Sequence, residues 1–401
     1  MAGLNPFEIK VDLDVSPQDK ALLAECDNDA GENSMGELRH QIAQAVMMGI
    51  DGPAPSPEEK RLIEQGVGGV ILFERNCTSP TQVAELIDNL QEIARSRGLQ
   101  TPLAVAIDQE HGPVTRIKEG ITPFPSAGNM GKMGESDLVR RAARIIGREL
   151  ALMGITMNLA PVADLLLHPQ NRVIGKRSYG RDPHRVGAMV VAAIEGLQGE
   201  GVAACAKHFP GHGATATDSH QALPTLERSR EELEKAELIP FQMGVRAEVA
   251  AIMPGHLLCP ALDPELPATL SPSIIQGLLR HALGFDGVVI SDDLAMNALA
   301  SWGSIEERGV AALKAGVDLL LVAKGTIQGL LDALKQGLDS GEIPQERAQE
   351  ACSRIRQLKE RYPYRGTGDI TGLRQEQDLA FSQQLFLMAG DEAGDPGDPT
   401  A

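Results

Sequence analysis

Aromatic side chains are scarce in this 401-residue chain, which has three tyrosines, eight phenylalanines and one tryptophan, 3% of all residues. That is too few for a platform of stacked rings that holds nucleic-acid bases or a long sugar chain, and a compact pocket suits the composition better. Cations are also in the minority, with 37 Lys and Arg against 55 Asp and Glu and a net charge of −18. Such a chain repels polyanions, so we expect neither nucleic acid nor an anionic membrane as a partner.

Cysteine and long apolar runs are scarce too. The five cysteines show no C-x-x-C spacing, and this scattered odd number indicates free thiols in a reducing compartment rather than disulfides. The first twenty residues carry acidic side chains where a secretion signal needs an apolar run. No later stretch reaches the roughly 18 apolar residues of a membrane span. We therefore expect a cytoplasmic protein.

What the chain does contain is a repeated alternation of short apolar runs with amphipathic stretches. The runs are apolar almost throughout, which is typical of parallel strands covered on both faces. The predicted strands are residues 45–50, 68–73, 103–108, 156–162, 202–208, 250–256, 287–293 and 317–323.

Helical patterns lie between these strands. One runs over residues 79–96 and another over 136–154, where Ser136 is a candidate N-cap and Gly154 a candidate end. Eight strands that alternate with helices predict an α/β fold, a (β/α)8 TIM-type barrel, with an open doubly wound sheet as the alternative. No G-x-G-x-x-G follows the first strand and no Walker-type loop is present, so a nucleotide cofactor is not expected.

The predicted domain organisation has three parts. Residues 1–36 form an acidic N-terminal extension, and 37–365 form a single catalytic barrel. Residues 366–401 form a C-terminal extension whose last part, rich in Asp, Gly and Pro, is expected to be disordered.

Polar side chains follow five of the eight predicted strands at their carboxyl ends. Any one of them could be ordinary turn chemistry, but in a barrel all would line one mouth, as a site for a hydroxyl-rich ligand requires. They are Asp108 with Arg116 nearby, Asn158 and Asp164, Lys207 and His208, His256, and Asp292 with Asp293. Asp108 is either a ligand-binding carboxylate or a partner of Arg116.

The densest polar segment is KHFPGHGATATDSH, residues 207–220. Its three histidines, His208, His212 and His220, suggest a metal site, but the proline and glycines disfavour the helix that His-x3-His spacing requires. Asp218 and His220 suggest instead a proton-transfer dyad, in which the carboxylate fixes the imidazole tautomer. A polar loop that caps turns is the third interpretation.

Two adjacent carboxylates occur in ISDDLAM. Neighbouring side chains on a strand point to opposite sides, so we expect only one of Asp292 and Asp293 to face the barrel axis. A carboxylate at a strand end suits nucleophilic attack on a sugar carbon, and an N-capping aspartate is the alternative.

Taken in order, six segments resemble glycoside hydrolase family 3, in its β-N-acetylglucosaminidase branch, over residues 37–325. KHFPGHG followed by DSH is a specific signal, whereas SDDL alone is weak. The segments are VAIDQEHGPVTR, NLAPVADL, IGKRSYGRDP, KHFPGHGATATDSH, MPGHLLCPALDPELPATLSP and GVVISDDLAM.

The resemblance implies a retaining, metal-free and cofactor-free glycosidase. It makes Asp292 the nucleophile and Asp218 with His220 the acid/base dyad. It implies that terminal β-linked N-acetylglucosamine is removed from a small carbohydrate, a chitooligosaccharide or a peptidoglycan-derived muropeptide, and the oligomeric state stays open, a monomer included. The implied sugar-binding residues are Asp108, Arg116, Arg177, Lys207 and His208.

Three positions depart from the family pattern. His111 and Pro113 replace a Gly and an Arg of DQEGGRV, and Ala214 replaces the Asp of GHGDT. None is the nucleophile or belongs to the dyad, so activity is still expected. Three alternatives remain: a phosphorylase of the same family, a β-glucosidase or β-xylosidase, and a non-catalytic sugar-binding protein.

Overall fold

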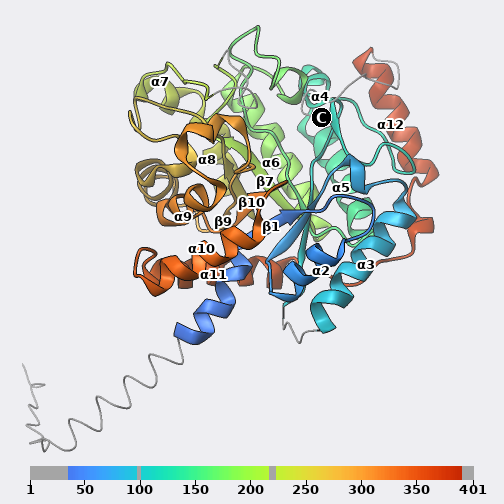
Figure 1. Cartoon of the computed structure of the whole chain (residues 1–401). Helices are drawn as coiled ribbons and strands as arrows, with labels where there is room; N and C mark the ends of the chain where they lie inside the picture. The colour runs from blue at the N-terminus through green and yellow to red at the C-terminus, as the bar shows by residue number, and fades with distance from the viewer. Residues whose placement is uncertain (1–34, 97–100, 216–222, 391–401) are drawn as a thin grey trace, which may run out of the picture.

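The computed structural model describes residues 35–96, 101–215 and 223–390. Eight parallel strands form one curled sheet at the centre of the molecule, in the order β10-β1-β2-β3-β6-β7-β8-β9, and helices surround it (Figure 1). The strands are β1 Val46–Gly49, β2 Gly69–Leu72, β3 Ala104–Ile107, β6 Met157–Asn158, β7 Ala203–Phe209, β8 Ala251–Pro254, β9 Val288–Val289 and β10 Leu320–Val322. A separate hairpin pairs β4 Gln109–His111 with β5 Val114–Thr115.

Backbone hydrogen bonds between the two outer strands close the sheet into a barrel. Ile290, directly after β9, forms a parallel bridge with Leu319, directly before β10. The Asp318 N–H donates to the carbonyl of Val289 at 2.8 Å, and the Ser291 N–H donates to the carbonyl of Leu319 at 2.9 Å. The TIM-type barrel predicted from the sequence is confirmed, and the open sheet is excluded.

All eight predicted strands occur, but most are shorter than their apolar runs, and β6 and β9 cover only two residues each. β6 covers two residues of the run 156–162, because Pro161 has no N–H to continue the ladder. The chain nevertheless stays beside β7, since the N–H of Cys205 donates to the carbonyl of Ala160 at 2.9 Å. An apolar run therefore predicts which residues lie in the barrel wall. It predicts less well at which residue the regular strand pairing ends.

Twelve main helices of the described residues pack outside the barrel or beside it (Figure 1). The helix predicted for 136–154 begins at Ser136, so the N-cap position is Glu135 and the prediction of Ser136 as N-cap is wrong by one residue. Gly154, with φ +84°, follows the end of that helix as predicted. The helices are α2 Pro57–Glu64, α3 Pro80–Ser96, α4 Ala127–Met133, α5 Ser136–Leu152, α6 Pro183–Gly199, α7 Arg230–Lys235, α8 Leu238–Arg246, η5 Ser273–Ala282, α9 Ile305–Ala315, α10 Ile327–Asp339, α11 Gln345–Arg361 and α12 Glu376–Ala389. Short 3-10 turns are η1 Ile42–Ala45, η2 Glu74–Asn76, η3 Gly175–Arg177, η4 Ala268–Leu270, η6 Asn297–Trp302 and η7 Ile370–Gly372.

The core lies between the barrel and its helices. Every residue of β2, β3 and β8 is buried, as the unbroken apolar runs predict. Helix α3 shows the matching helical pattern, because Val83, Leu86, Ile87 and Leu90 form one buried stripe. Full burial of such a side chain contributes about 1.5–3 kcal/mol.

The last described helix, α12, lies beside α4 and α5 on the right of Figure 1. Phe381 packs at 6.3 Å from Phe124, and Asp378 pairs with Arg148 at 2.5 Å. Residues 376–389 of the predicted C-terminal extension are thus part of the packed structure.

Within the described part of the chain, no helix combines the length and apolarity needed to cross a membrane.

A buried carboxylate reinforces the barrel closure, and its removal tests the energy of that closure. Asp318 is fully buried, pairs with Arg280 and Arg347, and accepts the N–H of Val289 at 2.9 Å. Asp318→Asn removes the buried charge that pairs with Arg280 and Arg347. Among the described residues, only Arg347 then keeps another carboxylate, Glu350, so the substitution should lower the free energy of unfolding by about 3–5 kcal/mol. Urea unfolding measures this loss. Asp339→Asn, which breaks an exposed pair with Arg39, is the control and should cost less than about 1 kcal/mol; equal losses in both variants would contradict the assignment.

The burial of Lys359 should make the stability of the folded protein depend on pH. The Lys359 side chain is buried, its Nζ donates to Gln44 Oε1 at 2.6 Å, and burial lowers its pKa to about 7. The unfolded chain, with a lysine pKa of about 10.4, binds more protons between pH 7 and 10, so the stability of the folded state rises with pH in this window. Lys359→Met should therefore raise the Tm most near pH 7, and the gap to wild type should shrink by pH 10. Thermal melts over this range measure the gap; an unchanging gap, as expected for the exposed control Lys60→Met, would refute the prediction.

Candidate active site

A cavity of about 160 Å³ opens at the carboxyl ends of the barrel strands. Its walls include residues in or just after seven of the eight barrel strands, among them Phe73 after β2, Leu159 after β6 and Met253 in β8. The barrel therefore gathers at one place the polar residues that are far apart in the sequence. Six predicted site residues line this cavity: Asp108, Arg116, Arg177, Lys207, His208 and Asp292.

A buried ion network forms one wall of the cavity. Lys207 Nζ lies 2.7 Å from Asp108 Oδ1 and 2.6 Å from Glu110 Oε1. Arg177 holds Glu110 with two hydrogen bonds, from Nε at 2.8 Å and from Nη2 at 2.9 Å. Arg116 Nη2 lies 3.3 Å from the second oxygen of Asp108. Asp108 is thus a partner of Arg116 and also lines the cavity, and its role as a ligand-binding carboxylate stays a prediction.

The network keeps its members charged. Burial alone would raise the pKa of Asp108, but Lys207 and Arg116 outweigh it and leave the pKa below its usual value. Burial would likewise raise the pKa of Glu110, and Arg177 with Lys207 lower it. Burial works to lower the pKa of Lys207, and the two carboxylates raise it above its usual value. Three cations against two carboxylates leave this wall with a net positive charge.

Glu110 is a site residue that the sequence reasoning did not single out. Its side chain is only 5% exposed and it contacts both Arg177 and Lys207. Strand alternation carried a signal, because residues 108 and 110 lie two apart and thus on one face of an extended chain. The hairpin β4–β5 holds Glu110 in this position.

Asp164 holds the segment of His208 and His212 in place through hydrogen bonds. It is fully buried and accepts His208 Nδ1 at 2.7 Å and the backbone N–H of His212 at 2.6 Å. Burial would raise the pKa of Asp164, and His208 lowers it. Because Nδ1 faces the carboxylate, the tautomer and orientation of His208 are set. The ring of His212 contacts Thr215 Oγ1 at 2.7 Å, and burial lowers its pKa to about 4.

Asp292 and Asp293 differ in what their carboxylates contact. Asp292 lines the cavity, and its Oδ1 accepts the N–H of Asp293 at 2.8 Å. Asp293 Oδ1 accepts the N–H groups of Ala295 and Ala323, both at 3.0 Å, so this carboxylate holds the turn together. Burial raises the pKa of Asp293. Both residues line the cavity, and the carboxylate of Asp293 is the one that makes structural bonds to the backbone of Ala295 and Ala323.

His256 connects this turn to the neighbouring loop. Its Nε2 lies 2.9 Å from the carbonyl oxygen of Asp293, and its Nδ1 lies 2.8 Å from Thr269 Oγ1. Burial lowers the pKa of His256. A carbonyl only accepts, so Nε2 carries the proton in the contact with Asp293. The backbone beside Asp292 is thereby held from two sides.

His111 lies behind the ion network, outside the 160 Å³ cavity. It adopts φ +68°, the left-handed region that suits the glycine of the family pattern. Its ring packs edge-on against Phe124 at 5.4 Å, and burial lowers its pKa to about 4. This packing explains how a histidine is accommodated there without contact with the cavity.

The predicted dyad, Asp218 and His220, lies outside the described residues, as does Cys26. The loop that leads toward the dyad is described up to Thr215, including the contacts of His208 and His212 with Asp164. Among the described residues, no three His, Cys, Asp or Glu side chains gather as metal ligands would.

Known proteins are similar to this chain over most of its sequence. A beta-hexosaminidase of Thioalkalivibrio sulfidiphilus is 41% identical over 308 residues, which span 74% of this chain and 86% of the relative. One of Nitrosomonas eutropha is 35% identical over 327 residues, 79% of this chain and 92% of the relative.

Solved structures show the same relationship. A glycoside hydrolase family 3 beta-N-acetylglucosaminidase from Paenibacillus sp. str. FPU-7 superposes with a TM-score of 0.85 at 41% identity, covering 88% of this chain and 68% of that one. NagZ from Neisseria gonorrhoeae in complex with N-trifluoroacetyl-D-glucosamine has a TM-score of 0.73 at 31% identity, covering 86% and 97%. The sequence also matches the Glycosyl hydrolase family 3 N terminal domain over residues 37–358. With this match over most of its length, the chain belongs to glycosyl hydrolase family 3 and is a glycoside hydrolase.

Proposed function

We propose that this enzyme is a retaining exo-acting β-N-acetylglucosaminidase with Asp292 as its nucleophile. The observation that carries the proposal is the placement of Asp292 in a small cavity opposite buried Asp108, Arg177 and Lys207. At about 160 Å³ the cavity is smaller than the roughly 300–1,000 Å³ of pockets for drug-sized ligands, so it suits one terminal sugar ring. The relatives named as beta-hexosaminidases and beta-N-acetylglucosaminidases support N-acetylglucosamine as that sugar.

The proposed reaction has two displacements. Asp292 attacks the anomeric carbon while His220, oriented by Asp218, gives a proton to the leaving oxygen. Water then attacks the glycosyl-enzyme as His220 takes its proton, which restores Asp292. A histidine suits both steps, because its ordinary pKa lies close to neutral pH.

The ion network would bind and orient the sugar. Its charged groups already hold one another in fixed positions, so little conformational entropy is lost when hydroxyl groups bind to them. Asp108 is expected to accept from sugar hydroxyls, and Arg177 and Lys207 are expected to donate to them.

We further propose that the enzyme works in the cytoplasm in peptidoglycan recycling, on N-acetylglucosaminyl muropeptides or chitooligosaccharides. Support comes from the five cysteines without disulfide spacing and from the bacterial relatives.

Substitution of Asp292 tests the nucleophile. Asp292→Ala should lower kcat on 4-nitrophenyl N-acetyl-β-D-glucosaminide by at least about a thousandfold, because the step that forms the glycosyl-enzyme is lost. Asp293→Asn is the matched control: the Asn side-chain oxygen still accepts the N–H groups of Ala295 and Ala323, so most activity should remain. The assay uses phosphate-free buffer with a chelator. Near-normal turnover of Asp292→Ala would refute the assignment, and turnover that requires phosphate would indicate a phosphorylase.

Glu110 is expected to act through the residues that it positions. Glu110→Gln removes the charge that Arg177 and Lys207 share, so both cations should shift and KM should rise at least about tenfold. Separate kcat and KM values on the same substrate, with Tm as a check on folding, measure the effect. Glu74→Gln, in an exposed pair with Lys118, is the control. An unchanged KM in folded Glu110→Gln would exclude a positioning role.

A further inference from the structure

Three cations without carboxylate partners gather on one cavity away from the sugar site. The cavity measures about 630 Å³ and is lined by Lys132, Arg181 and Arg185, all exposed. Lys132 Nζ donates to Asn129 Oδ1 at 3.1 Å, and Arg181 Nη2 donates to the carbonyl of Leu167 at 3.0 Å. These contacts are with neutral groups. Within the part of the chain that the structure describes, none of the three cations forms an ion pair.

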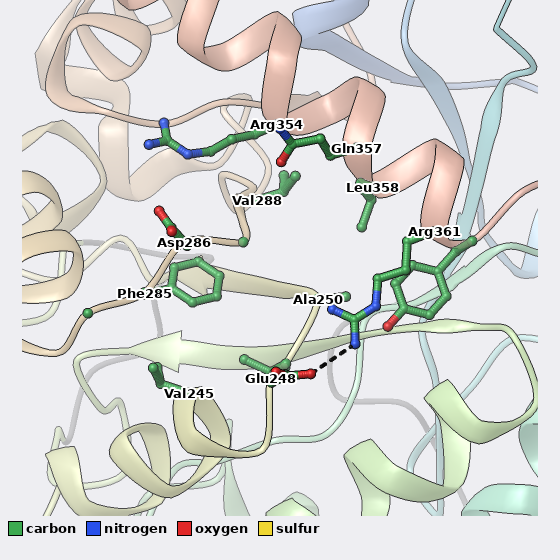
Figure 2. Close-up of a pocket in the computed structure, with 14 residues that line it drawn as sticks. Val245, Glu248, Ala250, Phe285, Asp286, Val288, Arg354, Gln357, Leu358 and Arg361 are labelled. Carbon is green, nitrogen blue, oxygen red and sulfur yellow. Dashed lines mark hydrogen bonds and ion pairs between the residues drawn. The ribbon is translucent and has the colours of Figure 1, made fainter.

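The arginines that line a second cavity are arranged differently. A cavity of about 360 Å³ near the amino ends of β8 and β9 is also lined by two arginines, Arg354 and Arg361 (Figure 2). Arg361 pairs with Glu248 at 3.4 Å, the dashed contact in Figure 2, and Arg354 lies 3.5 Å from Asp318. Carboxylates neutralise both arginines, as expected in a chain with net charge −18.

The cavity of Lys132, Arg181 and Arg185 keeps its positive charge. Among the described residues that line it, Asp182 is the carboxylate, and its Oδ1 accepts the N–H of Arg185 at 2.8 Å as the N-cap of α6. One carboxylate thus lines the cavity together with four basic residues, since Lys176 lines it as well. In a strongly acidic protein, such a concentration of positive charge attracts small anions locally.

The shape of the cavity allows an anion to approach closely. It lies between α4, the start of α6 and the segment 175–182. Gly175 and Gly180 line it, and no atom lies within 4 Å of the position that a Cβ would occupy at either residue. The same segment carries Arg177 into the sugar site, so the two sites share one stretch of backbone at the carboxyl side of the barrel.

We propose that this cavity binds a small anionic ligand with carboxylate or phosphate groups. Guanidinium groups bind both anions through paired N–H donors, and Lys132 adds a point charge. The anion is either a free molecule or an acidic group on the part of the substrate beyond the scissile bond. The binding site itself does not depend on the proposed glycosidase activity.

Calorimetric titration with inorganic phosphate and with tricarballylate, a tricarboxylate, tests the site. Lys132→Gln/Arg181→Gln/Arg185→Gln should raise the Kd of a bound probe at least about tenfold, and added salt should weaken wild-type binding. The control, Lys60→Gln/Arg61→Gln/Arg246→Gln, removes equal charge from exposed positions elsewhere and should bind as wild type does. Because the substituted residues are exposed, both triple variants should fold as wild type does, and their Tm values check this. Equal binding by both triple variants, or no wild-type binding at millimolar concentrations, would overturn the proposal.

Kinetics then distinguish the two sources of the anion. The substrates are N-acetylglucosaminyl-N-acetylmuramic acid, which carries a carboxylate, and neutral chitobiose. A KM that rises in the first triple variant for the acidic substrate alone places the anion on the substrate. Unchanged KM values, with probe binding lost, indicate a free ligand. If wild type hydrolyses neither sugar, the proposed function fails while the titration still decides the anion site.

Discussion

The closed ring of backbone hydrogen bonds is the constraint on which the rest of this structure depends. A few N–H to carbonyl hydrogen bonds join the chain after β9 to the chain before β10. They connect Val289 and Ser291 with Asp318 and Leu319. With the ring closed, all carboxyl ends of the strands face one mouth. Residues far apart in the sequence, such as Ile71 and Leu321, then meet around one cavity.

Burial of charge is the second constraint, and it explains why the site is built as a network. Lys207 and Arg177 are almost fully buried, which is tolerable only because Asp108 and Glu110 neutralise them at hydrogen-bond distance. Each carboxylate serves two cations, so none of these side chains can move alone. Asp293 differs from Asp292 in that its carboxylate accepts the N–H groups of Ala295 and Ala323, although both aspartates line the cavity.

Much of this was predictable from local patterns. The apolar runs located all eight strands, and the polar residues after them identified the mouth of the barrel. The choice of Asp292 as nucleophile, and the roles of Asp218 and His220, came from the family resemblance and stay proposals, the last two because they lie outside the described residues. Glu110 was not singled out, and the contact of Asp164 with His208 was not foreseen, because the partners lie 67 and 44 residues away and no local pattern shows such a pairing.

The sequence by itself determined the fold class, the strand positions and the family, because these depend on hydrophobic periodicity and on motifs that are continuous in the chain. Only the tertiary structure decided barrel closure and the sharing of Glu110 between Arg177 and Lys207. It likewise decided that the carboxylate of Asp293 binds the N–H groups of Ala295 and Ala323. It also decided which cations lack carboxylate partners, the basis for the proposed anion site. These features depend on distances between distant segments, and a pairing of charges is energetically defined only once burial and geometry are known.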